Sequence, residues 1–170
     1  ELCRYQMDCK LYLFPLLDIQ NLIMEKVDSK YWIILFRRAM IKISNLLAYK
    51  NGYKVLVSGE NIGQVASQTL SNIRATADAA DRPILRPLAG LNKEDIIRIA
   101  EKIGTYEISI EPYDDCCSFF VPIHPETKAD LETVRKIEGN IDFGDMFDVA
   151  LNDAAIKTIE HPDYIKKTVY

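Results

Sequence analysis

Hydrophobic and polar positions change their spacing most clearly at residues 55–77. Residues 55–57 (VLV) form an unbroken apolar run, which is typical of a strand covered on both faces. Residues 58–61 (SGEN) predict a turn. Apolar and small residues then recur at helical spacing, and they predict a helix whose buried face is formed by Ala66, Thr69, Leu70, Ile73 and Ala77.

Further elements are predicted before this unit. Residues 11–14 predict a strand that ends at Pro15. Asp18 is expected to cap the next helix, and Gly52 is expected to end a longer one. Their apolar faces consist of Ile19, Leu22, Ile23 and Val27, and of Phe36, Met40, Ile43, Leu46 and Leu47. Arg37, Arg38 and Lys42 lie off the apolar face of the longer helix.

The pattern continues after residue 77. Residues 84–88 predict a strand, and a helix is expected to start at the cap Asn92 and to end at Gly104. A loop bounded by prolines follows at 112–125, and helices are expected at 126–138 and 143–159.

Alternation of strands and helices decides the expected fold class. Strands joined by helices indicate right-handed βαβ crossovers. We therefore expect an α/β fold, with a three-layer, mostly parallel, Rossmann-like sheet in a single domain that spans residues 1–170. Free backbone N–H groups at the carboxyl ends of such strands favour ligand binding there.

Composition narrows the function classes. A net charge of −4 over 170 residues argues against a dedicated nucleic-acid surface on this chain, although it leaves room for one basic face. Neither a membrane span of about 18 apolar residues nor a signal pattern is visible, so the chain is expected to be cytoplasmic. The four cysteines form no Cys-x-x-Cys pair and no secreted disulfide framework.

Cys116 and Cys117 are the first candidates for chemistry, because they stand side by side in the predicted loop after two acidic residues. They suit a pair of small packed residues or a reactive thiol, which would need a cation from elsewhere in the fold. A metal site with His124 is a third alternative, although adjacent cysteines chelate one ion awkwardly. We therefore predict no metal site.

Lys93 and Arg37 are the candidate cations. Lys93 lies in the first turn of its predicted helix, where the helix dipole disfavours a cation unless an anion binds there. Arg37 suits either a solvated helix face or a donor to a phosphate or base. A solvated lysine offset by acidic neighbours stays an equal alternative for Lys93.

Several segments together resemble the tRNA 4-thiouridine synthetases, sulfurtransferases also named for thiamine biosynthesis. The resemblance runs from about residue 8 to 128, in order. It is carried by SGENIGQVASQTL (58–70), LRPL (85–88), KEDII (93–97), KIGTYEISI (102–110) and DDCC (114–117). It implies a pyrophosphate-loop ATPase domain of the adenine nucleotide α-hydrolase-like type.

The resemblance also implies an activity. ATP, with Mg²⁺, would adenylate O4 of uridine 8 in tRNA, and a cysteine persulfide would then replace that oxygen with sulfur. Arg37, Gly59 and Gln68 match positions that bind the nucleotide, and Lys93 matches the lysine used in activation. Cys116 matches the sulfur-handling cysteine, whereas Cys117 matches a position that need not be cysteine.

The sequence departs from the family pattern in several places. No Ser-Gly-Gly-x-Asp-Ser loop, RNA-binding module or rhodanese-like domain occurs, and the chain opens on Glu1. We therefore expect the C-terminal part of the catalytic domain, with its first strands missing, a helical tail at 126–170 and little activity by itself. Adjacent cysteines also make the iron–sulfur cluster of some archaeal members an open question.

The resemblance implies partners as well. These are tRNA, bound mainly through an absent region, a sulfur donor such as a cysteine desulfurase, and possibly a second copy of the chain. The sulfur would also serve thiamine thiazole synthesis. Two alternatives stay open: a related adenylating enzyme with another substrate, which would need Gly59 and Gln68 but not the cysteines, or a non-catalytic nucleotide-binding module.

Overall fold

The chain forms an α/β structure with two compact units. The computed structural model describes residues 1–6, 8–112, 122 and 124–161. The smaller unit is drawn from Glu1–Phe14, Asn92–Tyr113 and Ala154–Tyr170, and the larger unit from Pro15–Leu91 and Asp114–Asp153. Each is described by itself below. The expectation of a single 170-residue domain stays a prediction.

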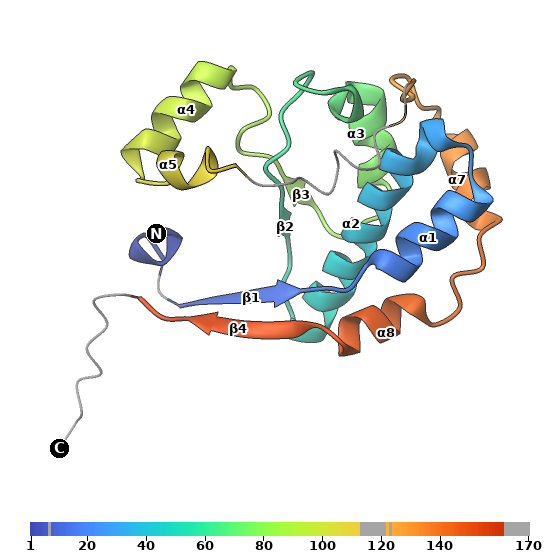
Figure 1. The fold of residues 1–170 in the computed structure, drawn as a ribbon, viewed down its shortest axis with the longest axis horizontal. Helices are drawn as coiled ribbons and strands as arrows, with labels where there is room; N and C mark the ends of the chain where they lie inside the picture. The colour runs from blue at the N-terminus through green and yellow to red at the C-terminus, as the bar shows by residue number, and fades with distance from the viewer. Residues whose placement is uncertain (7, 113–121, 123, 162–170) are drawn as a thin grey trace. The chain divides into compact units, whose positions relative to one another are not determined.

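Helix α2 is the centre of the larger unit. The described elements are α1 (Leu17–Lys26), η2 (Ser29–Tyr31), α2 (Trp32–Asn51), β2 (Leu56–Val57), η3 (Ala66–Gln68), α3 (Leu70–Ala77), β3 (Ile84–Leu85), α7 (Leu131–Gly139) and α8 (Met146–Asn152). Helix α2 contacts α1, α3, α8 and β2, as Figure 1 shows. Helix α2 buries apolar side chains such as Ile34, Leu35 and Ile43, and α1, which it contacts, buries Ile19 and Ile23. The core is therefore mainly helix packed on helix.

Gly52 ends α2 as the sequence predicts. Its φ of +72° lies in the left-handed region, which favours glycine, and its N–H bonds back to the carbonyl of Tyr49. The chain then turns into β2, which pairs in parallel with β3, with Leu56 opposite Ile84 and Val57 opposite Leu85. The carboxyl ends of both strands therefore lie at one edge.

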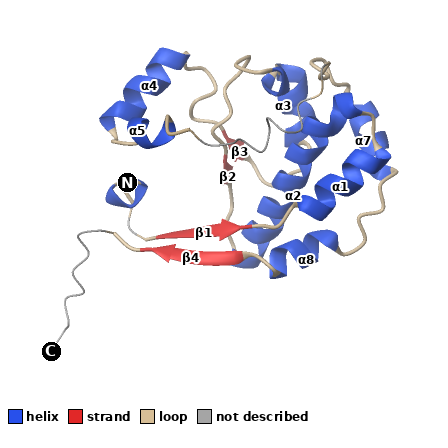
Figure 2. Cartoon of the chain, in the orientation of Figure 1, coloured by secondary structure: helices blue, strands red, loops and turns tan. Residues whose placement is uncertain are grey.

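The smaller unit contains the second strand pair. Its described elements are η1 (Leu2–Arg4), β1 (Cys9–Leu13), α4 (Lys93–Lys102), α5 (Tyr106–Ser109) and β4 (Ala155–Ile159). Strands β1 and β4 are antiparallel, with Cys9 opposite Ile159 and Leu13 opposite Ala155. Figure 2 shows these two short pairs of strands among the helices. The larger, mostly parallel sheet stays an expectation.

The prediction of one helix over 143–159 is wrong in its second half. Helix α8 ends at Asn152, and residues Ala155–Ile159 form a strand. The cause is pairing with residues 9–13, which are too distant in sequence for the periodicity of one segment to reveal. His161 consequently follows a strand and not a helix, and the tail is not wholly helical.

Local predictions around three helix starts also need correction. Helix α1 is capped at Leu16, and Asp18 lies in its first turn, where a carboxylate still favours the helix dipole. Helix α3 starts at Leu70 after its cap Thr69, and it buries Asn72, Ala75 and Thr76 while Leu70 is 68% exposed. Helix α7 starts at Leu131 and not at residue 126.

Arg38 is a further correction, because it is buried and not on a polar outer face. Its guanidinium bonds to the carbonyl oxygen of Ala75 and to the carboxylates of Asp78 and Glu138, at 3.3 and 2.7 Å for the two carboxylates. These contacts join α2 to the end of α3, which lies beside it in Figure 1, and to α7. The charge is tolerated because both carboxylates compensate it.

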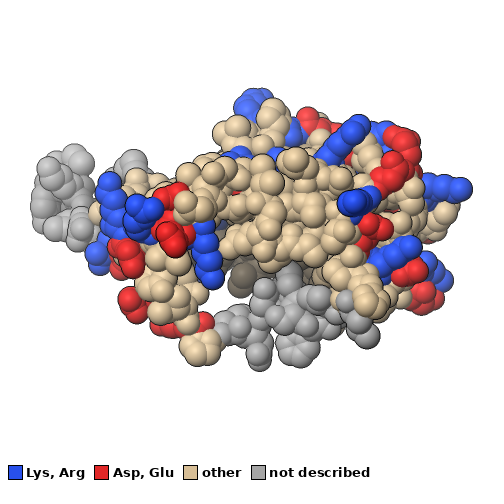
Figure 3. All heavy atoms as spheres, turned by 90° about the horizontal axis from the view of Figure 1, so that it is seen from above, with Lys and Arg blue, Asp and Glu red and all other residues tan. Residues whose placement is uncertain are grey.

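Surface charges are mixed in sign. On the face drawn in Figure 3, Lys and Arg side chains alternate with Asp and Glu and do not gather into one basic area. Among the described residues, no helix is long and apolar enough to cross a membrane.

Candidate functional site

The loops that leave β2 and β3 are joined by hydrogen bonds at the carboxyl edge of the pair. The N–H of Ser58 donates to the Leu85 carbonyl at 2.9 Å, and that of Ile62 donates to Ala89 at 3.2 Å. Buried Asn61 completes the junction, because its amide Nδ2 donates to the carbonyl oxygens of Leu88 and Leu91 at 3.1 and 2.5 Å. Residues 58–62 are therefore held by the neighbouring loop.

Gln68 closes the same loop from its far end. Its side-chain Oε1 accepts from the N–H of Asn61 at 3.2 Å, and its backbone carbonyl accepts from the N–H of Gly63 at 2.9 Å. Gly59 lies inside this loop, and a methyl group built on it would meet no atom within 4 Å. The structure thus brings Gly59 and Gln68 into one loop, with open space beside the glycine.

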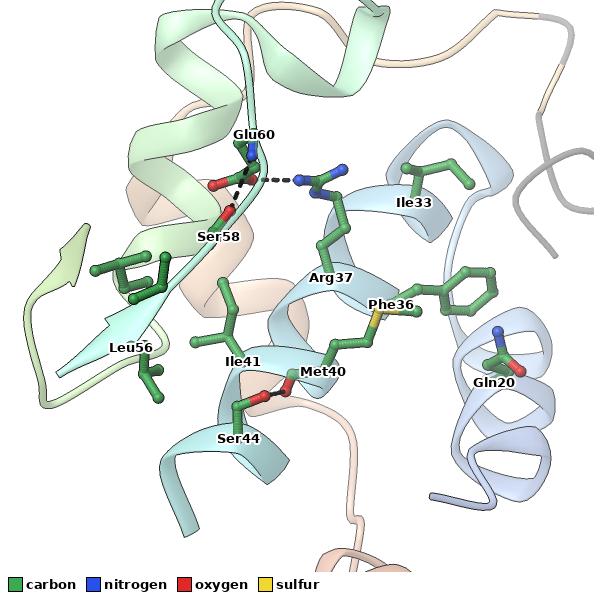
Figure 4. A pocket seen from close by; sticks show the side chains of 12 residues that line it. Gln20, Ile33, Phe36, Arg37, Met40, Ile41, Ser44, Leu56, Ser58 and Glu60 are labelled. Atoms are coloured by element: carbon green, nitrogen blue, oxygen red, sulfur yellow. Dashed lines mark hydrogen bonds and ion pairs between the residues drawn. The ribbon is translucent and has the colours of Figure 1, made fainter. Parts of the chain in front are cut away.

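Glu60 links this loop to α2 and to the loop after β3. One carboxylate oxygen accepts from Nη2 of Arg37, and the other accepts from Nε of Arg86 at 2.7 Å. Figure 4 shows the Arg37 side chain reaching from α2 toward Glu60. The Glu60 side chain is only 6% exposed. Burial by itself would raise its pKa, but the hydrogen bonds from Arg86 and Arg37 outweigh that effect, and the pKa lies below its usual value.

The cluster of Arg37, Arg86 and Glu60 has N–H donors without a partner among the described residues. Two guanidinium groups share one carboxylate, so one positive charge remains. Nε of Arg37 and Nη2 of Arg86 are buried, and among the described residues neither has a hydrogen-bond partner. Buried donors of this kind usually have a partner, and a bound anion would supply it. The arrangement can therefore bind a phosphate or carboxylate group at the carboxyl edge of the strands.

A cavity of about 330 Å³ adjoins the cluster. It lies within the larger unit, and its lining comes from α1, α2, the two strands and the loop after β2: Gln20, Ile33, Phe36, Arg37, Met40, Ile41, Ser44, Leu56, Val57, Ser58, Glu60 and Ile84. Figure 4 shows Arg37, Ser58 and Glu60 at one end of this lining and the apolar side chains beyond them. An apolar cavity beside a few polar groups is the usual form of a small-molecule site.

Lys93 belongs to the smaller unit. It is the first residue of α4, and Asn92 caps this helix as predicted, with its Oδ1 accepting from the N–H of Asp95 at 2.8 Å. The Lys93 side chain is exposed. Cys116 and Cys117 lie outside the described residues. The structure therefore groups Arg37, Gly59 and Gln68 and leaves the role of the cysteines a prediction.

Glu60, Asn61 and Arg86 are missing from the predicted site residues, although they lie within the 58–70 and 85–88 motifs. The available signal was position: polar residues directly follow two short apolar strands, at the edge where open α/β sheets bind ligands. Among the described residues, no group of three or more His, Cys, Asp and Glu side chains could hold a metal ion.

Taken together, the parallel strands, the two arginines and the adjoining cavity define an α/β protein with a candidate ligand site at the carboxyl edge of the strands. The sequence model of the thiamine biosynthesis protein (ThiI) family matches residues 1–143, and the chain belongs to this family.

Known relatives are similar over most of this chain. A protein from Caldanaerobacter subterraneus subsp. tengcongensis, named a probable tRNA sulfurtransferase, is 44% identical over 147 residues, which cover 86% of this chain and 39% of the relative. A protein of the same name from Thermus thermophilus is 38% identical over 162 residues, covering 95% and 40%. The chain thus spans about two fifths of the length of these relatives.

A solved structure agrees with the sequence comparison. It is described as a 4-thiouridine synthetase–RNA complex with bound ATP, and its TM-score to this chain is 0.85 at 38% identity. The match covers 90% of this chain and 40% of that one.

Proposed function

We propose that this chain is part of the catalytic domain of an ATP-dependent tRNA sulfurtransferase that makes 4-thiouridine at position 8 of tRNA. The observation that carries the proposal is the cluster of Arg37, Arg86 and Glu60, with its unpartnered donors beside a cavity. A similar structure that is an ATP and RNA complex supports this assignment of the ligand.

Within that proposal, the larger unit holds ATP. Arg37 and Arg86 offer donors to an anion, the open space beside Gly59 admits a ligand close to the backbone, and Gln68 keeps the loop in shape. ATP supplies the adenylyl group that turns the uracil oxygen into a leaving group. We assign Mg²⁺ to the triphosphate, because Mg²⁺ is usually bound through substrate phosphates with few protein ligands.

Lys93 and the cysteines have separate tasks. Lys93 stabilises negative charge that develops during adenylation. The terminal sulfur of a Cys116 persulfide attacks C4 of the activated uracil, and AMP leaves with the oxygen. Cys117 then attacks the Cys116 sulfur, so that 4-thiouridine is released and a disulfide remains for a reductant to open. The same sulfur would serve thiamine thiazole synthesis.

The strand pair supports a proposal for the finer fold. Strands β2 and β3 are short, and the side chains of Val57 and Leu85 are exposed although they are apolar. We propose that additional parallel strands extend this pair at its edges in the full-length protein and that helices cover both faces, giving the three-layer, Rossmann-like sheet. We also propose that the full-length protein is cytoplasmic and binds tRNA through an RNA-binding region. Its further partners would be a sulfur donor, such as a cysteine desulfurase, and a second copy of the chain.

The test is a thiolation assay with the full-length protein, ATP, tRNA and a persulfide donor. Wild-type protein should form 4-thiouridine, and Cys116→Ser should abolish it while ATP-dependent AMP release continues. Cys9→Ser is the matched control and should keep full activity. Thiouridine formation by Cys116→Ser at the wild-type rate would contradict the sulfur assignment, and an inactive wild type would favour a non-catalytic nucleotide-binding module.

A further inference from the structure

Asn61 lies at the junction of the two loops that leave β2 and β3. It is only 7% exposed, and its Nδ2 donates to two carbonyl oxygens of the second loop, those of Leu88 and Leu91, at 3.1 and 2.5 Å. Because both partners are acceptors, the end of the amide that faces them must be the NH₂ group and not the oxygen. One short side chain thus supplies two directed donors to a single neighbouring loop.

The two loops carry an ion pair of the candidate site. Glu60 directly precedes Asn61 in the first loop. Arg86 opens the second loop, and its carbonyl accepts from the N–H of Ala89 at 3.2 Å, so that Arg86 and Leu88 lie in the same tight turn. Across the junction, the carboxylate of Glu60 accepts from Nε of Arg86 at 2.7 Å. Asn61 therefore joins the two backbone segments whose side chains form this ion pair.

The ion pair by itself defines the spacing of the two backbones only loosely. Glutamate and arginine have long side chains with many rotamers, so they can keep a hydrogen bond while their backbones shift. The Asn61 side chain is short, and its two hydrogen bonds depend on distance and direction. Backbone bonds, such as the one from the N–H of Ile62 to the Ala89 carbonyl at 3.2 Å, keep the loops attached without it. Asn61 therefore fixes the spacing of the loops more than it holds the fold together.

We propose that Asn61 is a positioning residue for ATP binding. This inference rests on the proposed function, in which Arg37 and Arg86 offer donors to an anionic group of ATP. Asn61 acts by fixing the backbone of Glu60 relative to that of Arg86. Both guanidinium groups thereby stay on one carboxylate, and their N–H donors that lack a partner among the described residues stay available to one anion. A shift of the loops weakens ATP binding because this preorganisation is lost.

The experiment measures the dissociation constant of ATP for the full-length protein by equilibrium binding. Asn61→Asp keeps the size of the side chain but turns an acceptor oxygen toward the two carbonyls. We expect it to raise the dissociation constant about tenfold at about pH 8, which is the loss of roughly one charge-assisted hydrogen bond. Urea unfolding followed by Trp32 fluorescence checks that the larger unit is folded. Asn51→Asp, the same change at an exposed amide that donates to the Leu47 carbonyl, is the matched control and should bind ATP as wild type does.

A pH profile distinguishes lost positioning from a general loss of stability. When the new carboxyl group of Asn61→Asp is protonated, its O–H can donate to one of the two carbonyls again. Burial among acceptor oxygens and the adjacent charge of Glu60 raise the pKa of that group. Glu60 itself has a lowered pKa, so it keeps its charge at about pH 5, as do Arg37 and Arg86. Relative to wild type, the ATP-binding defect of Asn61→Asp should therefore shrink from about pH 8 to about pH 5, whereas that of Asn61→Ala should not.

Each outcome decides for or against the positioning role. Wild-type ATP affinity in Asn61→Asp at about pH 8 would overturn it, as would defects of Asn61→Asp and Asn61→Ala that respond equally to pH. If Asn61→Asp does not fold, Asn61→Ala decides: an unchanged dissociation constant overturns the role, and a rise of about tenfold in a folded protein supports it. A wild-type protein that binds no ATP would instead refute the proposed function.

Discussion

Glu60→Gln is the most informative single change, because Glu60 compensates two arginines at once. The glutamine has the same size, so the change removes a charge and not volume. Its one amide oxygen can accept from Arg37 or from Arg86, and its NH₂ group then faces the other guanidinium. The variant therefore holds two neighbouring cations with no anion between them.

The expected cost follows from burial. Removing one partner of a buried ion pair costs about 3–5 kcal/mol. The guanidinium side chains of Arg37 and Arg86 are 23% and 17% exposed, so water screens part of their repulsion. We therefore expect the free energy of unfolding to fall by about 2–3 kcal/mol at pH 7. The urea midpoint should fall by about 1 M.

Trp32 provides the assay, because it is the only tryptophan and its Nε1 donates to the Val27 carbonyl at 2.8 Å at the start of α2. Urea unfolding followed by its fluorescence reports on the larger unit. Glu132→Gln is the matched control, since Glu132 is exposed and pairs with Arg135 on the surface of α7. It should change the free energy of unfolding by less than about 1 kcal/mol.

The difference in the free energy of unfolding between wild type and Glu60→Gln should become smaller at acidic pH. The pKa of Glu60 is lowered in the folded protein, so its stabilising contribution is complete above the usual glutamate pKa of about 4.3. It is lost as the pH falls from there through the lowered folded pKa. If the two urea midpoints coincide at pH 7, or if their difference grows as the pH falls below about 4, the charge argument is wrong.

Two further predictions concern a helix start and a helix end. Lys93→Ala should lower the turnover of the full-length enzyme, measured by steady-state kinetics, far more than its tRNA affinity, measured by filter binding. Helix α4 should be unaffected or slightly more stable. A loss confined to KM would exclude the activating role. Gly52→Ala should lower the free energy of unfolding by about 1 kcal/mol in urea titrations, because its φ of +72° is unfavourable for alanine. No atom lies within 4 Å of the added methyl group, so a steric clash is not the cause. Gly139→Ala in α7 should be neutral or stabilising. Equal effects of the two glycine changes would show that backbone strain is not the cause.

Local signals in the sequence were enough for several features. Gly52 ends α2 and Asn92 caps α4 because each depends on backbone groups within a few residues. The segments of β2 and β3 were also predicted, since each is a short apolar run between turn residues. The expected cover on both faces is not seen, because Val57 and Leu85 are exposed. Gln68 was predicted to lie on a helix, whereas the structure places it in η3, before α3, with a side-chain bond to Asn61 of the loop that contains Gly59.

Pairing between distant segments was decided only by the tertiary structure. The strand at 155–159 exists because residues 9–13 pair with it. Arg38 is buried because the carboxylates of Asp78, just after α3, and Glu138 of α7 meet it there. The hydrogen bonds of Glu60 to Arg37 and Arg86 could not be predicted from the sequence, because these partners come from other segments. The same holds for Asn72 and residues 126–129. The free-energy cost of burying a polar side chain is offset only when it forms hydrogen bonds. Because another part of the chain supplies the partner, the sequence around such a residue does not show that it is buried.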